Sequence, residues 1–114
     1  MKRSNSRTIL TAIAIAAAVY AGGSHAADIE KGRAKADQVC AACHGKDGNT
    51  PVDPSYPRLA GQSADYLYQA LLAYQNESRK NAIMGGMAKP LTRAEMRDLA
   101  AYFASLPGQL SYKR

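Results

Sequence analysis

The chain is poor in the residues that build metal clusters and aromatic binding surfaces. Its 114 residues include no tryptophan, one phenylalanine, two cysteines and two histidines. A structural zinc needs four ligands, and this chain has no second Cys or His pair to complete a tetrahedron. Nucleic-acid-binding proteins combine a dense basic surface with aromatic platforms, which this composition does not provide. We therefore expect neither a structural zinc nor a nucleic-acid partner.

The first 26 residues differ in character from the rest of the chain. MKRSNSR contains three basic residues and no acid, TILTAIAIAAAVYA is an uninterrupted apolar run, and GGSHAA ends in small residues. This order is typical of a secretory signal peptide. An uncleaved anchor is the alternative, but the apolar run is shorter than the ~20 residues that span a bilayer. We expect residues 1–26 to be removed after Ala26, leaving a periplasmic protein of residues 27–114 without stable membrane insertion.

Removal of that segment changes both the net charge and the number of side chains that could bind a metal. Three of the 15 Lys and Arg residues lie in it, so 12 remain against 9 acidic residues, and the net charge falls from +6 to +3. His25 is also removed, which leaves His44 as the one histidine. A domain this small buries little apolar surface and often depends on a metal, a disulfide or a cofactor.

Three segments have helical periodicity, and none alternates as a half-buried strand would. The first covers residues 28–43, with both cysteines at its end. The second covers residues 63–76, with Ser63 as its N-cap. The third starts at Thr92, where TRAE has the spacing of a capping box, and stops before Pro107. The sequence therefore predicts an all-α fold of three main helices.

The two connecting segments are long and contain distinctive residues. Residues 45–62 hold three prolines and three glycines, which rule out extended regular structure. Residues 76–90 contain IMGGM, which we expect to form a loop. Long loops with such residues suggest chain wrapped around a bound group.

The stretch CAACH places Cys40, Cys43 and His44 within five residues. A thiol redox motif would start a helix beside a strand, whereas this one ends a helix. A disulfide between the two cysteines would close a very small loop and leave the histidine unexplained. The pattern C-x-x-C-H is typical of covalent haem attachment, with both thiols bonded to the porphyrin and the histidine bound to iron. The sequence thus predicts one haem c, with Cys40, Cys43 and His44 binding it.

The sixth position on iron then needs a ligand, and the thioethers of Met84, Met87 and Met96 are the candidates. Met96 belongs to the inward face of the third helix, where a methionine is better explained as core. Met84 and Met87 flank Gly85 and Gly86, which would let the backbone approach a flat ring. The spacing alone does not choose between these two methionines.

At this point the chain resembles the class I c-type cytochromes, and within them the short c4-like and c553-like bacterial proteins. The resemblance covers nearly all of residues 27–114 and rests on four segments in the right order: CAACHGKDGN, YPRLAGQSADYLYQAL, RKNAIMGGMAKPLT and MRDLAAYFASLPG. It implies a small cytochrome c fold whose loops surround a single covalently bound haem.

The resemblance also implies roles for individual residues. Met84 matches the iron-binding methionine of the M-x-G-M loop, with Met87 as second choice. Pro54 matches the proline whose carbonyl accepts a hydrogen bond from the proximal histidine. Gly32 and Tyr102 match the glycine and the aromatic residue at the crossing of the first and last helices. Arg58 and Arg79 are candidates to pair with haem propionates.

One position departs from the family pattern. These proteins often have glycine in the turn after the second helix, and here NESR offers Asn76 or Glu77. If the turn requires a positive φ, asparagine would adopt it more readily than glutamate.

A haem with both axial positions filled cannot bind a substrate, so we expect an electron carrier and not an enzyme. Donor and acceptor would be transient redox partners, respiratory or dehydrogenase proteins, and the carrier itself would be a monomer. Basic residues of the two long loops could steer docking: Lys46, Arg58, Arg79, Lys80 and Lys89. The alternatives are a haem subunit fixed to a periplasmic dehydrogenase, or a gas sensor or peroxidase-like enzyme with a labile sixth ligand.

Overall fold

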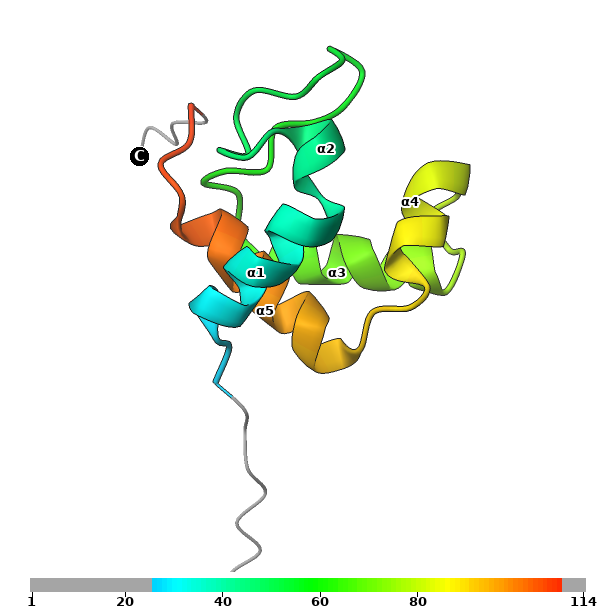
Figure 1. The fold of residues 1–114 in the computed structure, drawn as a ribbon. Coiled ribbons are helices and arrows are strands. Elements are labelled where there is room, and N and C mark those ends of the chain that lie inside the picture. The colour runs from blue at the N-terminus through cyan, green and yellow to red at the C-terminus, as the bar shows by residue number, and fades with distance from the viewer. Residues whose placement is uncertain (1–25, 110–114) are drawn as a thin grey trace, which may run out of the picture.

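The computed structural model describes residues 26–109, and every regular element within that range is a helix (Figure 1). The expected signal peptide lies almost wholly outside the described residues. The elements are α1 (Ile29–Val39), α2 (Ala41–His44), α3 (Ala64–Gln75), α4 (Ala82–Ala88) and α5 (Arg93–Ser105). The all-α prediction is therefore confirmed for this part of the chain. None of its helices is both long enough and apolar enough to cross a membrane.

Helices α1 and α5 cross in close contact at Gly32. A Cβ atom at this position would clash with the carbonyl oxygen of Asp98 and lie 2.9 Å from the Cβ of Tyr102. Only glycine fits such an approach, as expected from the resemblance, and Tyr102 is buried beside it. Two polar contacts brace the same crossing: the Asp28 amide donates to the Asp98 carboxylate at 2.8 Å, and Lys35 pairs with Glu95 at 2.8 Å.

The helix starts follow the capping residues of the sequence. The Ser63 hydroxyl accepts a hydrogen bond from the Tyr66 amide at the start of α3. At the start of α5, Thr92 and Glu95 form a complete capping box. Helix α5 then supplies most of the core, packing against α1 and α3. The core consists of eight buried residues: Ala36, Leu67, Leu91, Met96, Leu99, Ala100, Tyr102 and Phe103.

Two helix predictions need correction. The segment 28–43 is not one helix, because the chain turns at Cys40 (φ −108°) before α2 begins. No glycine or proline lies next to Cys40, so the local sequence does not indicate this turn. The expected IMGGM loop is instead the helix α4. Its two glycines each disfavour a helix by about 1 kcal/mol relative to alanine, but Asn81 caps the first turn through the amides of Ile83 and Met84.

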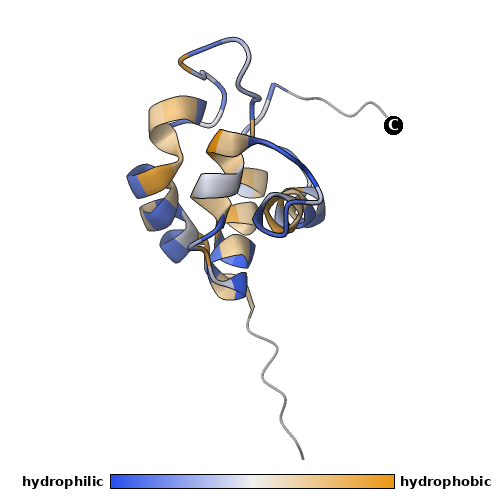
Figure 2. Cartoon of the chain, turned by 90° about the vertical axis from the view of Figure 1, so that its right-hand side faces the viewer, coloured by the Kyte–Doolittle hydropathy of each residue, from blue (hydrophilic) through white to orange (hydrophobic). Residues whose placement is uncertain are grey.

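The two short helices, α2 and α4, have a common arrangement relative to α3. Figure 1 shows α2 and α4 on the same side of α3, with the segment between α2 and α3 arching beyond α2. Figure 2 shows the chain around α2 as mostly hydrophobic and the following loop as mostly hydrophilic. The predicted haem-binding residues of α2 and α4 therefore come from two separate short helices that flank the core.

Candidate functional site

Cys40 lies at the junction of α1 and α2, and Cys43 lies within α2. No disulfide joins the two cysteines, and both residues are half-buried. No group of three or more Cys, His, Asp or Glu side chains gathers around one point anywhere in residues 26–109. Cys40, Cys43 and His44 are thus close in sequence without converging as the ligands of a metal ion must. A porphyrin fits this arrangement, because the two cysteines would hold it by thioether bonds at the ring edge and only the histidine would need to reach the iron.

The environment of Cys40 also argues against thiol redox chemistry. Burial raises the pKa of this thiol to about 11, and the nearby Lys35 only partly offsets the effect. At neutral pH Cys40 is therefore almost entirely protonated. A redox-active CxxC needs a thiolate, with a pKa lowered by a helix N-terminus or a cation. The site accordingly fits covalent attachment to a cofactor better than reversible disulfide exchange.

His44 is held in one orientation by a backbone carbonyl. Its side chain is buried, with 6% exposure, and its Nδ1 lies 2.9 Å from the carbonyl oxygen of Pro57. A carbonyl oxygen can only accept, so Nδ1 carries the proton and the Nε2 lone pair remains available to a metal. The prediction that Pro54 supplies this carbonyl is wrong. Three prolines lie at three-residue intervals in this loop, and the sequence could not say which one folds back over the imidazole.

A set of hydrogen bonds fixes the loop that carries Pro57. Asp47 accepts hydrogen bonds from the amides of Asn49 and Thr50 at 2.8 and 2.9 Å. The Asn49 side-chain amide donates to the Pro107 carbonyl at 2.7 Å. The backbone carbonyl of Asn49 accepts a hydrogen bond from Arg58 Nε at 2.9 Å. These contacts hold the loop against Pro107, in the segment that follows α5.

This bracing role of Asp47 and Asn49 was not predicted from the sequence. The pKa of Asp47 lies below its ordinary value because of the Asn49 amide, and next the Thr50 hydroxyl. The run Asp-Gly-Asn is a typical turn sequence and could have indicated it. Arg58, expected near a propionate, donates within the loop, so its pairing with a haem stays a prediction.

The three methionines occupy distinct environments. Met96 is fully buried in the core, as predicted. Met84 and Met87 lie three residues apart in α4 and therefore point to the same side of that helix. Met84 is half-buried, whereas Met87 is 39% exposed. Of the two candidates, Met84 is the one set closer to the body of the protein.

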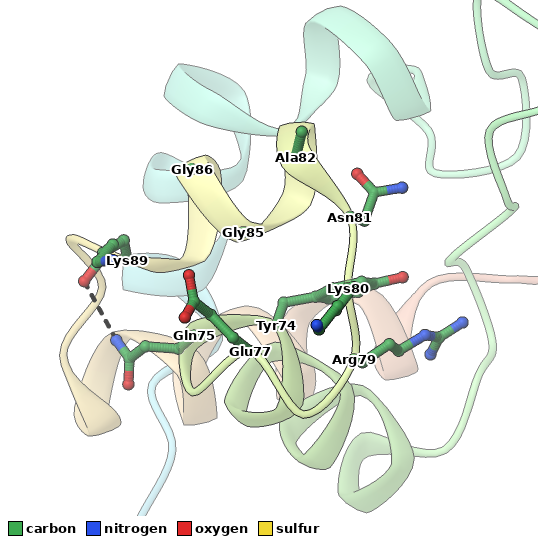
Figure 3. A pocket seen from close by; sticks show the side chains of 10 residues that line it. All are labelled: Tyr74, Gln75, Glu77, Arg79, Lys80, Asn81, Ala82, Gly85, Gly86 and Lys89. Atoms are coloured by element: carbon green, nitrogen blue, oxygen red, sulfur yellow. Dashed lines mark hydrogen bonds between the residues drawn. The ribbon is translucent and has the colours of Figure 1, made fainter.

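A cavity of about 480 Å³ lies between the end of α3, the turn after it and α4 (Figure 3). It is lined by Arg79, Lys80 and Lys89 among other residues and by neither histidine nor methionine. Arg79 donates to the Tyr66 hydroxyl at 3.4 Å and lies over the ring of Tyr74, at 4.9 Å from its centroid. The cavity is therefore separate from the predicted haem ligands, and Arg79 has protein partners already.

The turn after α3 contains an unusual backbone conformation. Glu77 has φ +65°, whereas Asn76 has φ −90°. The expected positive φ is therefore present in this turn, but at the glutamate and not at the asparagine, which would adopt it more readily. The left-handed conformation costs an L-residue with a Cβ roughly 1–2 kcal/mol.

Comparison with known proteins places the chain among haem proteins. Residues 29–107 match the cytochrome c family. The chain is 48% identical over 80 residues to a cytochrome c4 of Thiocapsa roseopersicina, covering 70% of this chain and 41% of the relative. It is 40% identical over 67 residues to the cytochrome subunit of sulfide dehydrogenase of Chlorobaculum tepidum, covering 59% of each.

The solved structures agree with the sequence relatives. The crystal structure of reduced recombinant cytochrome c4 from Pseudomonas stutzeri matches with a TM-score of 0.67 and 41% identity, covering 76% of this chain and 50% of that one. The chain thus spans about half the length of each of these three relatives.

Proposed function

Because this chain belongs to the cytochrome c family and has one haem c bound through Cys40 and Cys43, we propose that it is a periplasmic carrier of single electrons and not an enzyme. The haem, when bound, supplies a couple between ferrous and ferric iron. Cytochrome c4 relatives are electron-transfer haem proteins, which supports this function. The role of the protein is then to bind the haem, fix its axial ligands and present it to redox partners.

The observation that carries the proposal is the hydrogen bond between His44 Nδ1 and the Pro57 carbonyl. It fixes the tautomer that leaves Nε2 free to bind iron, and it makes the imidazole a stronger donor. A histidine buried and oriented in this way by the backbone is prepared for a permanent ligand. Once Nε2 binds iron, neither ring nitrogen would remain free to act as an acid or a base.

For the second axial ligand we propose Met84 in preference to Met87. The Met84 amide donates to Asn81 at 2.9 Å, so the first turn of α4 holds this residue in place. Ala88 follows Met84 by four residues on the same helix face and is fully buried, which fixes that face toward the core. With both axial positions filled by protein, no position remains for a substrate.

Export and partner binding follow from the sequence and the surface. The predicted signal peptide supports a periplasmic location, and a net charge of +3 for residues 27–114 supports transient electrostatic docking to acidic partners. The five basic residues expected at the docking surface are all exposed: Lys46, Arg58, Arg79, Lys80 and Lys89. We propose that the carrier is a monomer, since a shuttle must dissociate after each transfer.

Methionine substitutions test the proposed site. In the holoprotein, Met84→Ala should abolish the sulfur-to-iron charge-transfer band of the ferric state and lower the reduction potential. Met87→Ala is the matched control and should leave both unchanged. Retention of the band in Met84→Ala, with its loss in Met87→Ala, would reverse the assignment.

A fixed subunit of a dehydrogenase is the second candidate function. It is favoured by the Chlorobaculum tepidum relative, which is a cytochrome subunit of sulfide dehydrogenase, and by apolar side chains left open in this chain. Ile83 is 56% exposed and Val52 is 69% exposed. Size-exclusion chromatography of the protein from its native periplasm separates the two functions, because a free carrier elutes alone and a subunit elutes with its enzyme.

A further inference from the structure

Helix α4 is too short and too rich in glycine to be stable by itself. It has seven residues, AIMGGMA, and two of them are glycines. Isolated helices shorter than about 12–15 residues are marginal in water even without glycine. Neither glycine is needed for packing against the rest of the protein, since a Cβ at Gly86 would meet no protein atom within 4 Å and one at Gly85 would make only an ordinary contact with the Tyr74 carbonyl, at 3.7 Å. The place of α4 must therefore be set by groups outside it.

The first of these groups is at the start of the helix. Asn81 Oδ1 accepts from the amides of Ile83 and Met84, at 3.0 and 2.9 Å. This contact shapes the first turn, but Asn81 belongs to the same exposed segment as α4. It does not tie the helix to the rest of the molecule.

The second group is Gln75, in the last turn of α3, and it reaches the other end of α4. Its Nε2 donates to the carbonyl oxygens of Ala88, Lys89 and Leu91, at 3.0, 3.3 and 2.8 Å. Figure 3 shows the Gln75 amide turned toward Lys89 across the gap between α3 and α4. One side chain thus binds three carbonyls where α4 ends and the link to α5 begins.

These carbonyls belong to a region withdrawn from water. Ala88 is fully buried, and Leu91 is 9% exposed and part of the core. The last carbonyls of a helix lack partners within it, so they need donors from elsewhere. Without Gln75 the Ala88 carbonyl would keep the Leu91 amide as a donor at 3.1 Å, but the part-buried Leu91 carbonyl would lose its Gln75 donor. That loss opposes keeping this end of α4 where it is.

We propose that Gln75 is the positioning residue of the axial methionine. Ala88 lies one helical turn beyond Met84 on the same face, so fixing the Ala88 carbonyl fixes the helix that presents the Met84 thioether. Gln75 acts through α4 and does not touch the haem ligand. This inference rests on the proposed function, in which Met84 binds the iron.

The test compares three substitutions in the holoprotein. Gln75→Leu has a similar volume and no donor. Gln69→Leu makes the same chemical change on an exposed position of the same helix. Gln75→Lys restores a donor to the carbonyls, since an ammonium at the end of a helix can bind its last carbonyls. The readouts are the sulfur-to-iron charge-transfer band of the ferric state and the carbon monoxide affinity of the ferrous state.

In Gln75→Leu the carbon monoxide affinity should rise about tenfold to a hundredfold, as the methionine leaves the iron more often. The band should weaken in parallel. Gln69→Leu should match the wild type, and Gln75→Lys should recover most of the loss. A Gln75→Leu protein with wild-type band and carbon monoxide affinity would overturn the inference, even if its thermal stability fell. If Gln75→Leu gives no holoprotein, Gln75→Asn, whose shorter side chain reaches fewer carbonyls, decides by the same readouts.

Two controls separate this inference from the proposed function. The wild type should bind carbon monoxide weakly, and Met84→Ala should bind it readily. If both controls behave so and Gln75→Leu resembles the wild type, only the role of Gln75 is refuted. If the wild type already binds carbon monoxide readily, or if Met84→Ala changes nothing, the axial assignment itself is refuted.

Discussion

The Nδ1 atom of His44 lies 2.9 Å from the carbonyl oxygen of Pro57, 13 residues further along the chain. This single contact joins α2, which holds the cysteine pair, to the irregular loop that follows it. The hydrogen bonds within the loop therefore place one carbonyl oxygen where it sets the tautomer and the donor strength of the proposed iron ligand.

Substituting the two neighbouring prolines tests that relationship. Pro57→Gly should loosen the carbonyl and weaken its hydrogen bond, which makes the imidazole a poorer donor to ferric iron. The reduction potential of the holoprotein should then rise, on the order of tens of millivolts. Pro54→Gly adds the same backbone freedom at an exposed position without contact to His44, so its potential should stay at the wild-type value. Equal shifts in both variants, measured by redox titration, would contradict this role of Pro57.

Two glycines that lie in helices should differ in their response to alanine. Gly32→Ala places a Cβ against the Asp98 carbonyl, so it should lower the free energy of unfolding by about 3 kcal/mol or more. A Cβ at Gly86 meets no protein atom within 4 Å, so Gly86→Ala should change the free energy of unfolding much less than Gly32→Ala does. Denaturant unfolding of the two holoproteins measures both changes. An equal loss in the two variants would contradict the close crossing of α1 and α5 at Gly32.

Glu77 offers a stabilising substitution. Its φ of +65° is costly for glutamate and favourable for glycine, so Glu77→Gly should raise the free energy of unfolding by about 1 kcal/mol. Glu77→Ala retains a Cβ and should bring no such gain, which makes it the matched control. Thermal unfolding of the three proteins provides the comparison, and a gain in Glu77→Ala equal to that in Glu77→Gly would rule out backbone strain as its origin.

The loop carboxylate predicts a dependence of stability on pH. The pKa of Asp47 is lowered, chiefly by the Asn49 amide. A lowered carboxyl pKa stabilises the fold above the ordinary pKa of about 4, and this contribution disappears as the pH falls through the folded value. The thermal midpoint of the wild type should thus exceed that of Asp47→Asn at neutral pH and approach it in acid. Parallel curves from pH 7 down to pH 2 would show that Asp47 does not couple to folding.

The features that the sequence predicted correctly are those with a local cause. The N-cap of Ser63 and the capping box of Thr92 and Glu95 depend on neighbouring residues alone. Cys40, Cys43 and His44 stand at a fixed spacing within five residues. Gly32 was found through the family resemblance, and the structure gives its physical reason in the Asp98 carbonyl.

The features that were wrong or missed depend on contacts between distant segments. The choice of Pro57 over Pro54 depends on how the loop closes against Pro107, far along the chain. Helix α4 forms although its glycines disfavour it, because Asn81 caps one end and Gln75 binds the other. No local pattern marks Gln75, since its three acceptors are backbone carbonyls that any sequence provides.

We propose that CAACH binds a haem whose two axial positions are both filled by the protein. The optical spectrum of the purified ferrous protein, before and after addition of carbon monoxide, tests this directly. We expect the spectrum of a covalently bound haem c that carbon monoxide leaves unchanged at neutral pH. A spectrum that shifts at once with carbon monoxide would contradict the filled sixth position and favour a gas sensor or enzyme, and a protein without haem would refute the role of CAACH itself.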